Sequence, residues 1–149
     1  MRLLPIAALV VGLTLPAAAE PVTVTDGDTI KLDGATYRLW GIDAPEAKQW
    51  CGDYAAGVIA SGTLAKLVNG AAHVACEAKA TDRYGRTVAI CRADGRDLGQ
   101  AMVRLGMAWA FTRYSGQYVP DQEAAAADNL GIHRHACMPA WDWRASQRR

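Results

Sequence analysis

The sequence has no large net charge, no shortage of apolar residues and no low-complexity tract beyond Ala124–Ala127. Its 149 residues carry a formal net charge of +1, and 51% of them are hydrophobic, whereas a disordered chain has few apolar residues and a large charge. It also has no linker and no internal repeat, which excludes an array of domains. After the N-terminal segment there is no apolar run long enough to span a bilayer. We therefore predict one globular domain, residues 20–149, that is not attached to a membrane.

The N-terminal segment has the pattern of a secretory signal. Met1-Arg2 precedes an apolar stretch over residues 3–15, which is followed by Pro16-Ala17-Ala18-Ala19. An uncleaved anchor is the alternative, but a span takes about 20 apolar residues, and this stretch is shorter and interrupted by proline and glycine. A basic start, a short apolar run and an Ala-x-Ala end are typical of a cleaved signal peptide. We expect removal of residues 1–19 and a periplasmic or secreted product.

Cleavage would leave a mature chain without net charge. Residues 1–19 contain one cation, Arg2, and no anion, so 15 Lys and Arg would balance 15 Asp and Glu. Such a chain has no global field that attracts a polyanion. Arginine outnumbers lysine by 12 to 4 in the full sequence, and a guanidinium can donate paired hydrogen bonds to a phosphate. Any binding of nucleic acid must therefore depend on local arginines.

Four cysteines remain after the predicted cleavage, and an even number in a small exported domain indicates two disulfides. Three pairings are possible. Cys76 and Cys91 each lie seven residues from the centre of Asp82-Arg83-Tyr84-Gly85, so a hairpin turning there would place them opposite each other, although a glycine bulge at Gly85 would shift the register by one residue. The other pair is then Cys51 and Cys137. A zinc site is the alternative, but the sequence has no Cys-x-x-Cys pair.

The hydrophobic pattern predicts short strands combined with helices. Two strands flank Asp26-Gly27 within residues 22–32, and a third covers residues 37–42. Helical spacing follows within residues 53–68, then a hairpin of residues 74–78 and 87–91, then helices over residues 98–105 and about 120–130. Five short strands, with one helix after the third and two behind, predict an α+β domain built on a small Greek-key barrel.

Three clusters of charged residues fall where the predicted strands end. They are Asp26-Gly27-Asp28-Thr29, then Arg38 with Asp43-Ala44-Pro45-Glu46, and finally Asp82-Arg83-Tyr84-Gly85-Arg86. Each cluster alone is typical of a turn or a helix start, and only their combination points to chemistry.

Together the three clusters contain the groups needed to cleave a phosphodiester. Asp28, Asp43 and a nearby main-chain carbonyl would offer hard oxygen ligands to a divalent cation such as calcium. Arg38 and Arg86 are suited to binding a phosphate, and Glu46 to orienting or deprotonating an attacking water. We therefore predict metal-assisted hydrolysis.

The three motifs, in this order and at these separations, resemble the staphylococcal nuclease (thermonuclease) family. They read Asp-Gly-Asp-Thr, Arg-Leu-x-Gly-Ile-Asp-Ala-Pro-Glu and Thr-Asp-x-Tyr-Gly-Arg. The similarity extends from about Val22 to the region of residues 117–131. It implies an OB-type five-stranded β-barrel with three packed α-helices, dependence on one calcium ion, and hydrolysis of DNA and RNA to 3'-phosphate products with little sugar specificity. We expect a monomer.

The resemblance also implies a role for individual residues. The catalytic residues would be Arg38, Glu46 and Arg86; the metal site would comprise Asp28, Asp43, the carbonyl of Ala44 and nearby Asp26; and the nucleotide would contact Tyr84, Arg83 and Tyr114. Two positions depart from the family pattern: Thr112 stands where a tyrosine is expected near the base, and His133 where many relatives have tryptophan.

Two other interpretations compete with the enzyme. One is a nucleic-acid-binding module of the same fold that no longer cleaves, and the other is a calcium-stabilised interaction domain. The joint presence of Arg38, Glu46 and Arg86 favours the enzyme. Near the C-terminus, Trp141, Trp143 and Arg144 are expected to cover the barrel once Cys137 is tied down, with a platform for stacking on nucleic acid as the alternative.

Overall fold

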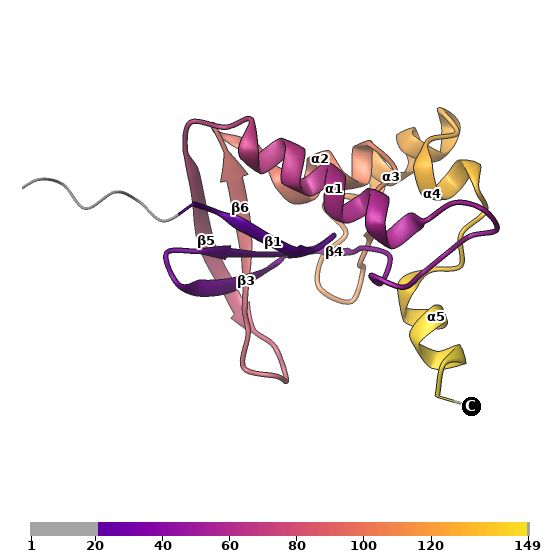
Figure 1. The fold of residues 1–149 in the computed structure, drawn as a ribbon, viewed down its shortest axis with the longest axis horizontal. Helices are drawn as coiled ribbons and strands as arrows, with labels where there is room; N and C mark the ends of the chain where they lie inside the picture. The colour runs from indigo at the N-terminus through magenta and orange to yellow at the C-terminus, as the bar shows by residue number, and fades with distance from the viewer. Residues whose placement is uncertain (1–20, 149) are drawn as a thin grey trace, which may run out of the picture.

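The computed structural model describes residues 21–148, and the predicted signal peptide lies outside the described residues (Figure 1). The described chain forms eight strands and five helices. The strands are β1 (Thr23–Asp26), β2 (Thr29–Leu32), β3 (Ala35–Leu39), β4 (Ile42–Asp43), β5 (Val74–Thr81), β6 (Thr87–Ala93), β7 (Arg96–Asp97) and β8 (Trp109–Ala110). The helices are α1 (Ala56–Asn69), α2 (Leu98–Arg104), α3 (Val119–Ala127), α4 (Gly131–Arg134) and α5 (Ala140–Ser146).

The strands form two sheets rather than one closed barrel. In the larger sheet β1, β2 and β3 are an antiparallel meander, β6 runs parallel to β3, and β5 and β7 are antiparallel to β6. The smaller sheet pairs β4 with β8. The combination of strands and helices confirms the α+β class. β1 and β5 end the path of paired strands in the described chain, so the prediction that the strands close into a five-stranded OB-type barrel is wrong.

The barrel prediction fails at the third predicted strand, residues 37–42. Gly41 adopts a φ of 71°, which residues other than glycine rarely adopt, and it divides this stretch into β3 and β4. The second piece leaves the larger sheet and pairs with β8 instead. The same turn therefore creates a sheet that the alternating pattern alone does not reveal.

The helices differ from the prediction in number, because the described chain has five and not three. α1 and α2 lie within the predicted ranges to one residue. The helix expected to reach residue 130 ends at Ala127, since Asn129 adopts a φ of 52°, and a short α4 follows. α5 was not predicted. Its Trp141 packs on Trp109 and Phe111, with ring centroids 6.1 and 5.8 Å away, as expected for a segment that covers the core.

Both disulfides have the pairings that the sequence predicts, Cys76–Cys91 and Cys51–Cys137. Gly85 has a φ of 78° in the hairpin turn, and the register at the tip is one residue out of step with the cysteines. A bulge at Lys79 in β5 restores it, so that Cys76 and Cys91 are direct partners across the ladder. The expected shift at the turn is thus present, and a second irregularity cancels it.

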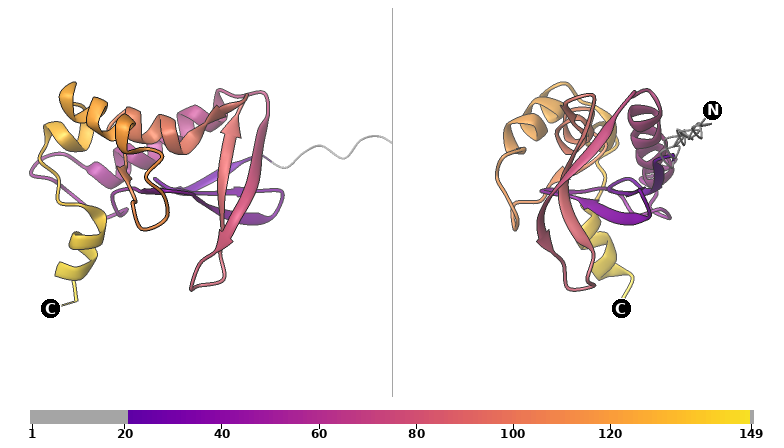
Figure 2. Two further views of the ribbon diagram at one scale, coloured as in Figure 1. Left: turned by 180° about the vertical axis from the view of Figure 1, so that it is seen from behind. Right: turned by 90° about the vertical axis from the view of Figure 1, so that its left-hand side faces the viewer.

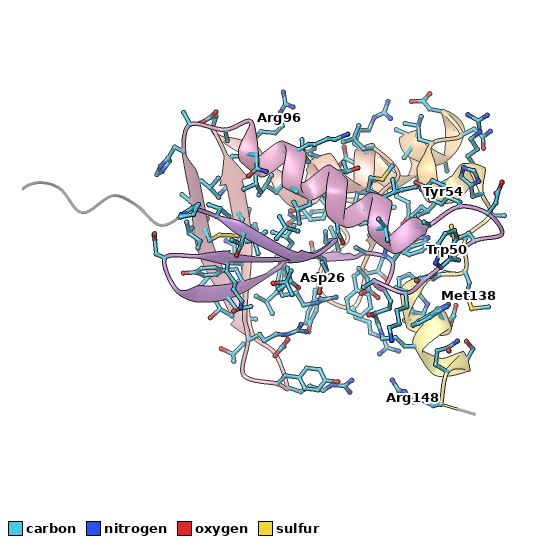
Figure 3. The ribbon with its side chains drawn as sticks, in the orientation of Figure 1. Asp26, Trp50, Tyr54, Arg96, Met138 and Arg148 are labelled. Atoms are coloured by element: carbon cyan, nitrogen blue, oxygen red, sulfur yellow. A yellow bond between two sulfur atoms is a disulfide. The ribbon has the colours of Figure 1, made fainter. Side chains whose placement is uncertain are left out.

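The helices and the charged segments lie on different sides of the sheets. α1, α2 and α3 cover one side, where Leu64, Leu98 and Met102 join the buried core. The tip of the β5–β6 hairpin and α5 project on the other side (Figure 1 and Figure 2). Figure 3 shows Asp26 between the hairpin and α5 in that view.

Candidate active site

Three of the predicted site residues converge on neighbouring strands. Asp28 precedes β2, Arg38 lies on β3 and Asp43 ends β4. The ladder register pairs Arg38 with Thr29, the residue after Asp28. All three side chains are buried, and Asp43 is the deepest, with 1% of its surface exposed. Because a buried charge is costly unless it is paired, the contacts among these residues define the site.

Arg38 links the two aspartates through a single nitrogen. Its Nη2 donates to Asp28 Oδ2 at 3.2 Å and to Asp43 Oδ1 at 2.9 Å. Asp28 also accepts the amide N–H of Ala44 at 3.2 Å and the hydroxyl of Thr29 at 3.0 Å. The two carboxylate oxygens are therefore close enough to share one cation, and a hard divalent ion takes donors of this kind.

Burial shifts the ionisation of these groups. Burial and the neighbouring Asp28 charge raise the pKa of Asp26 to about 6. Burial also raises the pKa of Asp43, although hydrogen bonds from Arg144 oppose it. For Arg38, burial alone would lower the pKa, but the charges of Asp28 and Asp43 raise it overall. A further positive charge would favour the ionised form of each carboxyl.

Asp26 is adjacent to Asp28, but within the described residues no hydrogen bond or ion pair links its side chain to Arg38 or Asp43. Its Oδ1 accepts the amide N–H of Asp28 at 3.1 Å, a contact within the turn. Among residues 21–148 no three His, Cys, Asp or Glu side chains come together in an arrangement that could hold a metal. Two carboxylates, from Asp28 and Asp43, are therefore the side-chain donors that the fold brings together.

Glu46 lies in the loop after β4 and is paired with Arg144, which sequence reasoning did not place in the site. Nη1 of Arg144 donates to Glu46 Oε1 at 2.6 Å and to Asp43 Oδ1 at 3.2 Å, and Nη2 donates to Asp43 Oδ2 at 2.7 Å. A signal was available: the predicted Cys51–Cys137 disulfide joins a position five residues after Glu46 to one seven residues before Arg144. The disulfide therefore brings the segment of Glu46 and the segment of Arg144 close together.

The hairpin-tip residues form a separate group. Arg86 Nε donates to Asp82 Oδ2 at 2.7 Å, and Arg83 Cζ lies 4.8 Å from the centre of the Tyr84 ring, which is 69% exposed. No hydrogen bond or ion pair in the described chain joins Arg86 to the carboxylate cluster. β6 nevertheless begins directly after Arg86, and its first residue pairs with Tyr37, beside Arg38. The hairpin therefore starts next to the cluster and extends away from it.

Tyr114 adjoins Arg38 through Phe111. Its ring is 5.3 Å from Phe111, and Phe111 is 6.0 Å from the guanidinium carbon of Arg38. Tyr114 is 38% exposed and follows the exposed Thr112 in the turn after β8. An aromatic surface thus adjoins the cluster.

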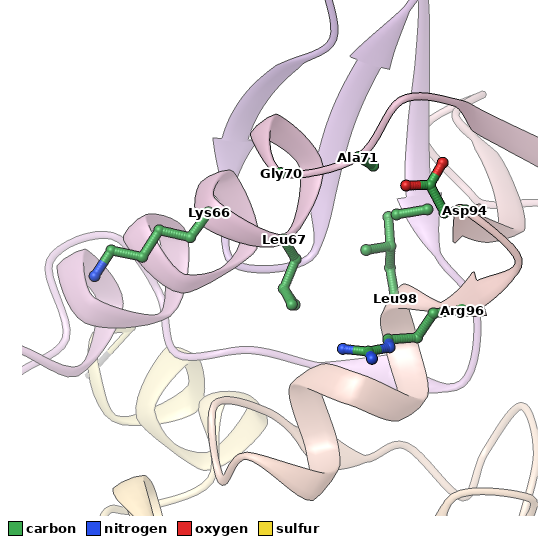
Figure 4. Close-up of a pocket in the computed structure, with 8 residues that line it drawn as sticks. Lys66, Leu67, Gly70, Ala71, Asp94, Arg96 and Leu98 are labelled. Carbon is green, nitrogen blue, oxygen red and sulfur yellow. The ribbon is translucent and has the colours of Figure 1, made fainter.

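The pocket in Figure 4 is a different feature. It has a volume of about 330 Å³ and lies between the end of α1 and the β6–β7 turn, and its lining includes Lys66, Asp94 and Arg96. None of the predicted site residues lines it. The candidate site therefore rests on the buried carboxylates and not on this hollow.

Comparison with known proteins gives one family match and several relatives whose names differ in kind. A family model described as "Staphylococcal nuclease homologue" matches residues 36–134. The chain is 36% identical over 135 residues to the succinoglycan biosynthesis protein ExoI of Rhizobium meliloti, covering 80% of this chain and 71% of that protein. It is 36% identical over 118 residues to an uncharacterized endonuclease of Haemophilus influenzae, with 74% and 63% covered. It is 34% identical over 131 residues to an uncharacterized endonuclease of Escherichia coli O157:H7, with 83% and 82% covered.

Proposed function

This chain belongs to the staphylococcal nuclease family, and on that premise we propose that it is an exported, calcium-dependent nuclease. It hydrolyses phosphodiester bonds of DNA and RNA with little sugar specificity and leaves 3'-phosphate ends. Two relatives that carry the name endonuclease support a nuclease at the family level. The observation that carries the proposal is the buried pair of aspartates that share one arginine nitrogen.

The donor set fits a calcium ion. Asp28 and Asp43 are the proposed carboxylate ligands, the carbonyl of Ala44 is a third, and Asp26 adds negative charge nearby. Calcium accepts carboxylate and carbonyl oxygens together with several waters, so a small number of protein ligands is sufficient. When bound, such an ion supplies a positive charge that polarises a phosphoryl oxygen.

The chain's own residues perform the remaining steps. Arg38 and Arg86 hold the phosphate and stabilise the charge that develops on its oxygens. Glu46 accepts the proton of a water whose oxygen attacks phosphorus, while the bond from phosphorus to the 5' oxygen breaks and that oxygen takes a proton from solvent water. The phosphate remains on the 3' side. Tyr84, Arg83 and Tyr114 contact the nucleotide, and their exposure is compatible with stacking.

Export is supported by the N-terminal pattern and by the two disulfides, which form and persist in oxidising compartments. We propose cleavage after Ala19, a mature domain of residues 20–149 that acts as a monomer, and a periplasmic or secreted location. Within residues 21–148 no helix combines the length and apolarity needed to cross a bilayer.

The test is degradation of heat-denatured DNA and of RNA by residues 20–149, with calcium or with a chelator. We expect calcium-dependent degradation that Glu46→Gln lowers about 10²- to 10⁴-fold, the usual contribution of a general base. Glu123→Gln removes the same charge from an exposed position on α3 and should leave the rate unchanged. If the wild type bound DNA but left it intact with every metal tested, the non-catalytic binding module would replace this proposal.

A further inference from the structure

Arg144 occupies both oxygens of the aspartate that we assign to the metal. Its two terminal nitrogens lie 3.2 Å from Oδ1 and 2.7 Å from Oδ2 of Asp43, and one of them also contacts Glu46 at 2.6 Å. Oδ1 of Asp43 accepts a further hydrogen bond from Arg38. A metal ion approaching Asp43 therefore meets a positive charge that already uses the same oxygen lone pairs.

Three independent contacts fix the segment that carries Arg144. The Cys51–Cys137 disulfide ties the chain before α5 to the loop that follows Glu46. Gln49 donates to the carbonyl of Met138 at 2.7 Å and accepts the amide N–H of Glu46 at 3.1 Å. On α5 itself, the Trp141 ring packs against Trp109 and Phe111, with ring centroids 6.1 and 5.8 Å apart. The position of α5 is thus fixed by covalent, polar and aromatic contacts.

The charges also show that Arg144 opposes a second cation. Asp28, Asp43 and Glu46 carry three negative charges, and Arg38 and Arg144 carry two positive ones, so the contacting group has a net charge of −1. Without Arg144 the net charge is −2, which matches a divalent ion. Arginine does not lose its proton in proteins, so only movement of the side chain can remove its charge.

We propose that Arg144 competes with calcium for Asp43, so that metal binding displaces its guanidinium and releases Glu46 for the attacking water. This inference rests on the proposed function. It makes α5 a determinant of metal affinity: the C-terminal segment weakens binding in the resting protein, and Glu46 becomes free when the metal is bound. Arg144 is a positioning residue in this scheme, because it acts through Asp43 and Glu46.

The test measures calcium binding without substrate, by titration calorimetry and by the rise in unfolding temperature with calcium. We expect Arg144→Gln to bind calcium about tenfold more tightly than the wild type, since removing one like charge close to the ion is worth at least this much in a partly exposed site. Arg148→Gln removes the same charge from an exposed position near the end of α5, and its affinity should stay within about twofold of the wild type.

Arg144→Lys provides a second variant that keeps the charge and the fold. A lysine cannot donate the forked pair of hydrogen bonds, so we expect its affinity to lie between those of the wild type and Arg144→Gln. Each variant is first compared with the wild type by circular dichroism in chelator. Equal or weaker calcium binding by both Arg144 variants would overturn the inference, and so would a failure of all the proteins to bind calcium.

The nuclease proposal is judged by a separate measurement. Calcium-dependent degradation of DNA with no change in affinity in the Arg144 variants would leave the nuclease intact and refute the competition. Tighter calcium binding by Arg144→Gln in a protein that never cleaves nucleic acid would support the competition and refute the nuclease.

Discussion

Removing the Cys51–Cys137 disulfide should destabilise the protein more than removing Cys76–Cys91. The two bridges close loops with sequence separations of 86 and 15 residues. From the loss of chain entropy in the unfolded state, the longer loop contributes about 4.6 kcal/mol and the shorter about 3 kcal/mol. The double variant Cys51→Ala/Cys137→Ala should therefore lose about 1.6 kcal/mol more than Cys76→Ala/Cys91→Ala.

The measurement is the free energy of unfolding from urea titrations of both double variants and the wild type, with a chelator present. Alanine at all four positions removes the same atoms from each pair, so the difference reports mainly on loop length. The reasoning fails if the Cys76 and Cys91 variant is the less stable one. It also fails if loss of the longer bridge costs less than about 1 kcal/mol, because α5 would then unfold independently of the domain.

Three further predictions concern packing, pH and charge. In α1, a Cβ added at Gly57 would lie 1.9 Å from the Glu46 carbonyl oxygen, whereas one added at Gly62 meets nothing within 4 Å. In thermal unfolding, Gly57→Ala should therefore lower the free energy of unfolding by about 3 kcal/mol. Gly62→Ala should raise it by up to about 1 kcal/mol. Burial lowers the pKa of His133 below its usual 6.5, so the folded state binds a proton at this residue less readily than the unfolded state. The stability that neutral His133 contributes is therefore present above pH 6.5 and is lost as the pH falls below 6.5. Urea midpoints at pH 7.5 and 5 should therefore differ less in His133→Asn than in the wild type. Arg38→Met should cost about 3–5 kcal/mol, because it leaves two buried carboxylates without their shared partner. Arg86→Met should cost less than about 1 kcal/mol, since the Arg86 side chain is partly exposed and Asp82 keeps its hydrogen bonds from the backbone amides of Tyr84 and Arg86. Equal losses in urea titrations would contradict the assignment of Arg38 to the buried cluster.

The sequence predicts local elements well, because they depend on nearby residues. The positions of β1, β2, α1 and α2 follow from alternating or helical spacing and from turn residues. What it does not reveal is the pairing of strands that are far apart in the chain, such as β3 with β6 and β4 with β8. β4 and β8 are two residues long each, too short for a recognisable alternation, and their pairing joins segments far apart in the chain.

The candidate site shows the same division. Asp28, Arg38 and Asp43 belong to motifs near the ends of strands, and the fold brings them together. Arg144 belongs to no such motif, and its neighbours Trp141 and Trp143 resemble a covering for the core. Its contact with Glu46 spans 98 residues and lies near the Cys51–Cys137 disulfide in the sequence, so it can be anticipated only by following the cysteine pairing to the residues on either side.

The site also combines residues inside and outside the segment that matches the family. Arg38, Asp43, Glu46 and the hairpin lie within residues 36–134, whereas Asp28 precedes that segment and Arg144 follows it. The buried aspartates require a cation in every state of the protein, since unpaired buried charge is costly. Arg38 meets that need from within the matched segment, in the core of the fold. Arg144 approaches from a tethered helix and is 32% exposed, so it is the cation that can leave when another arrives. The two arginines therefore differ in role for a physical reason: Arg38 is buried within the sheet, whereas the partly exposed side chain of Arg144 can move away without opening the core.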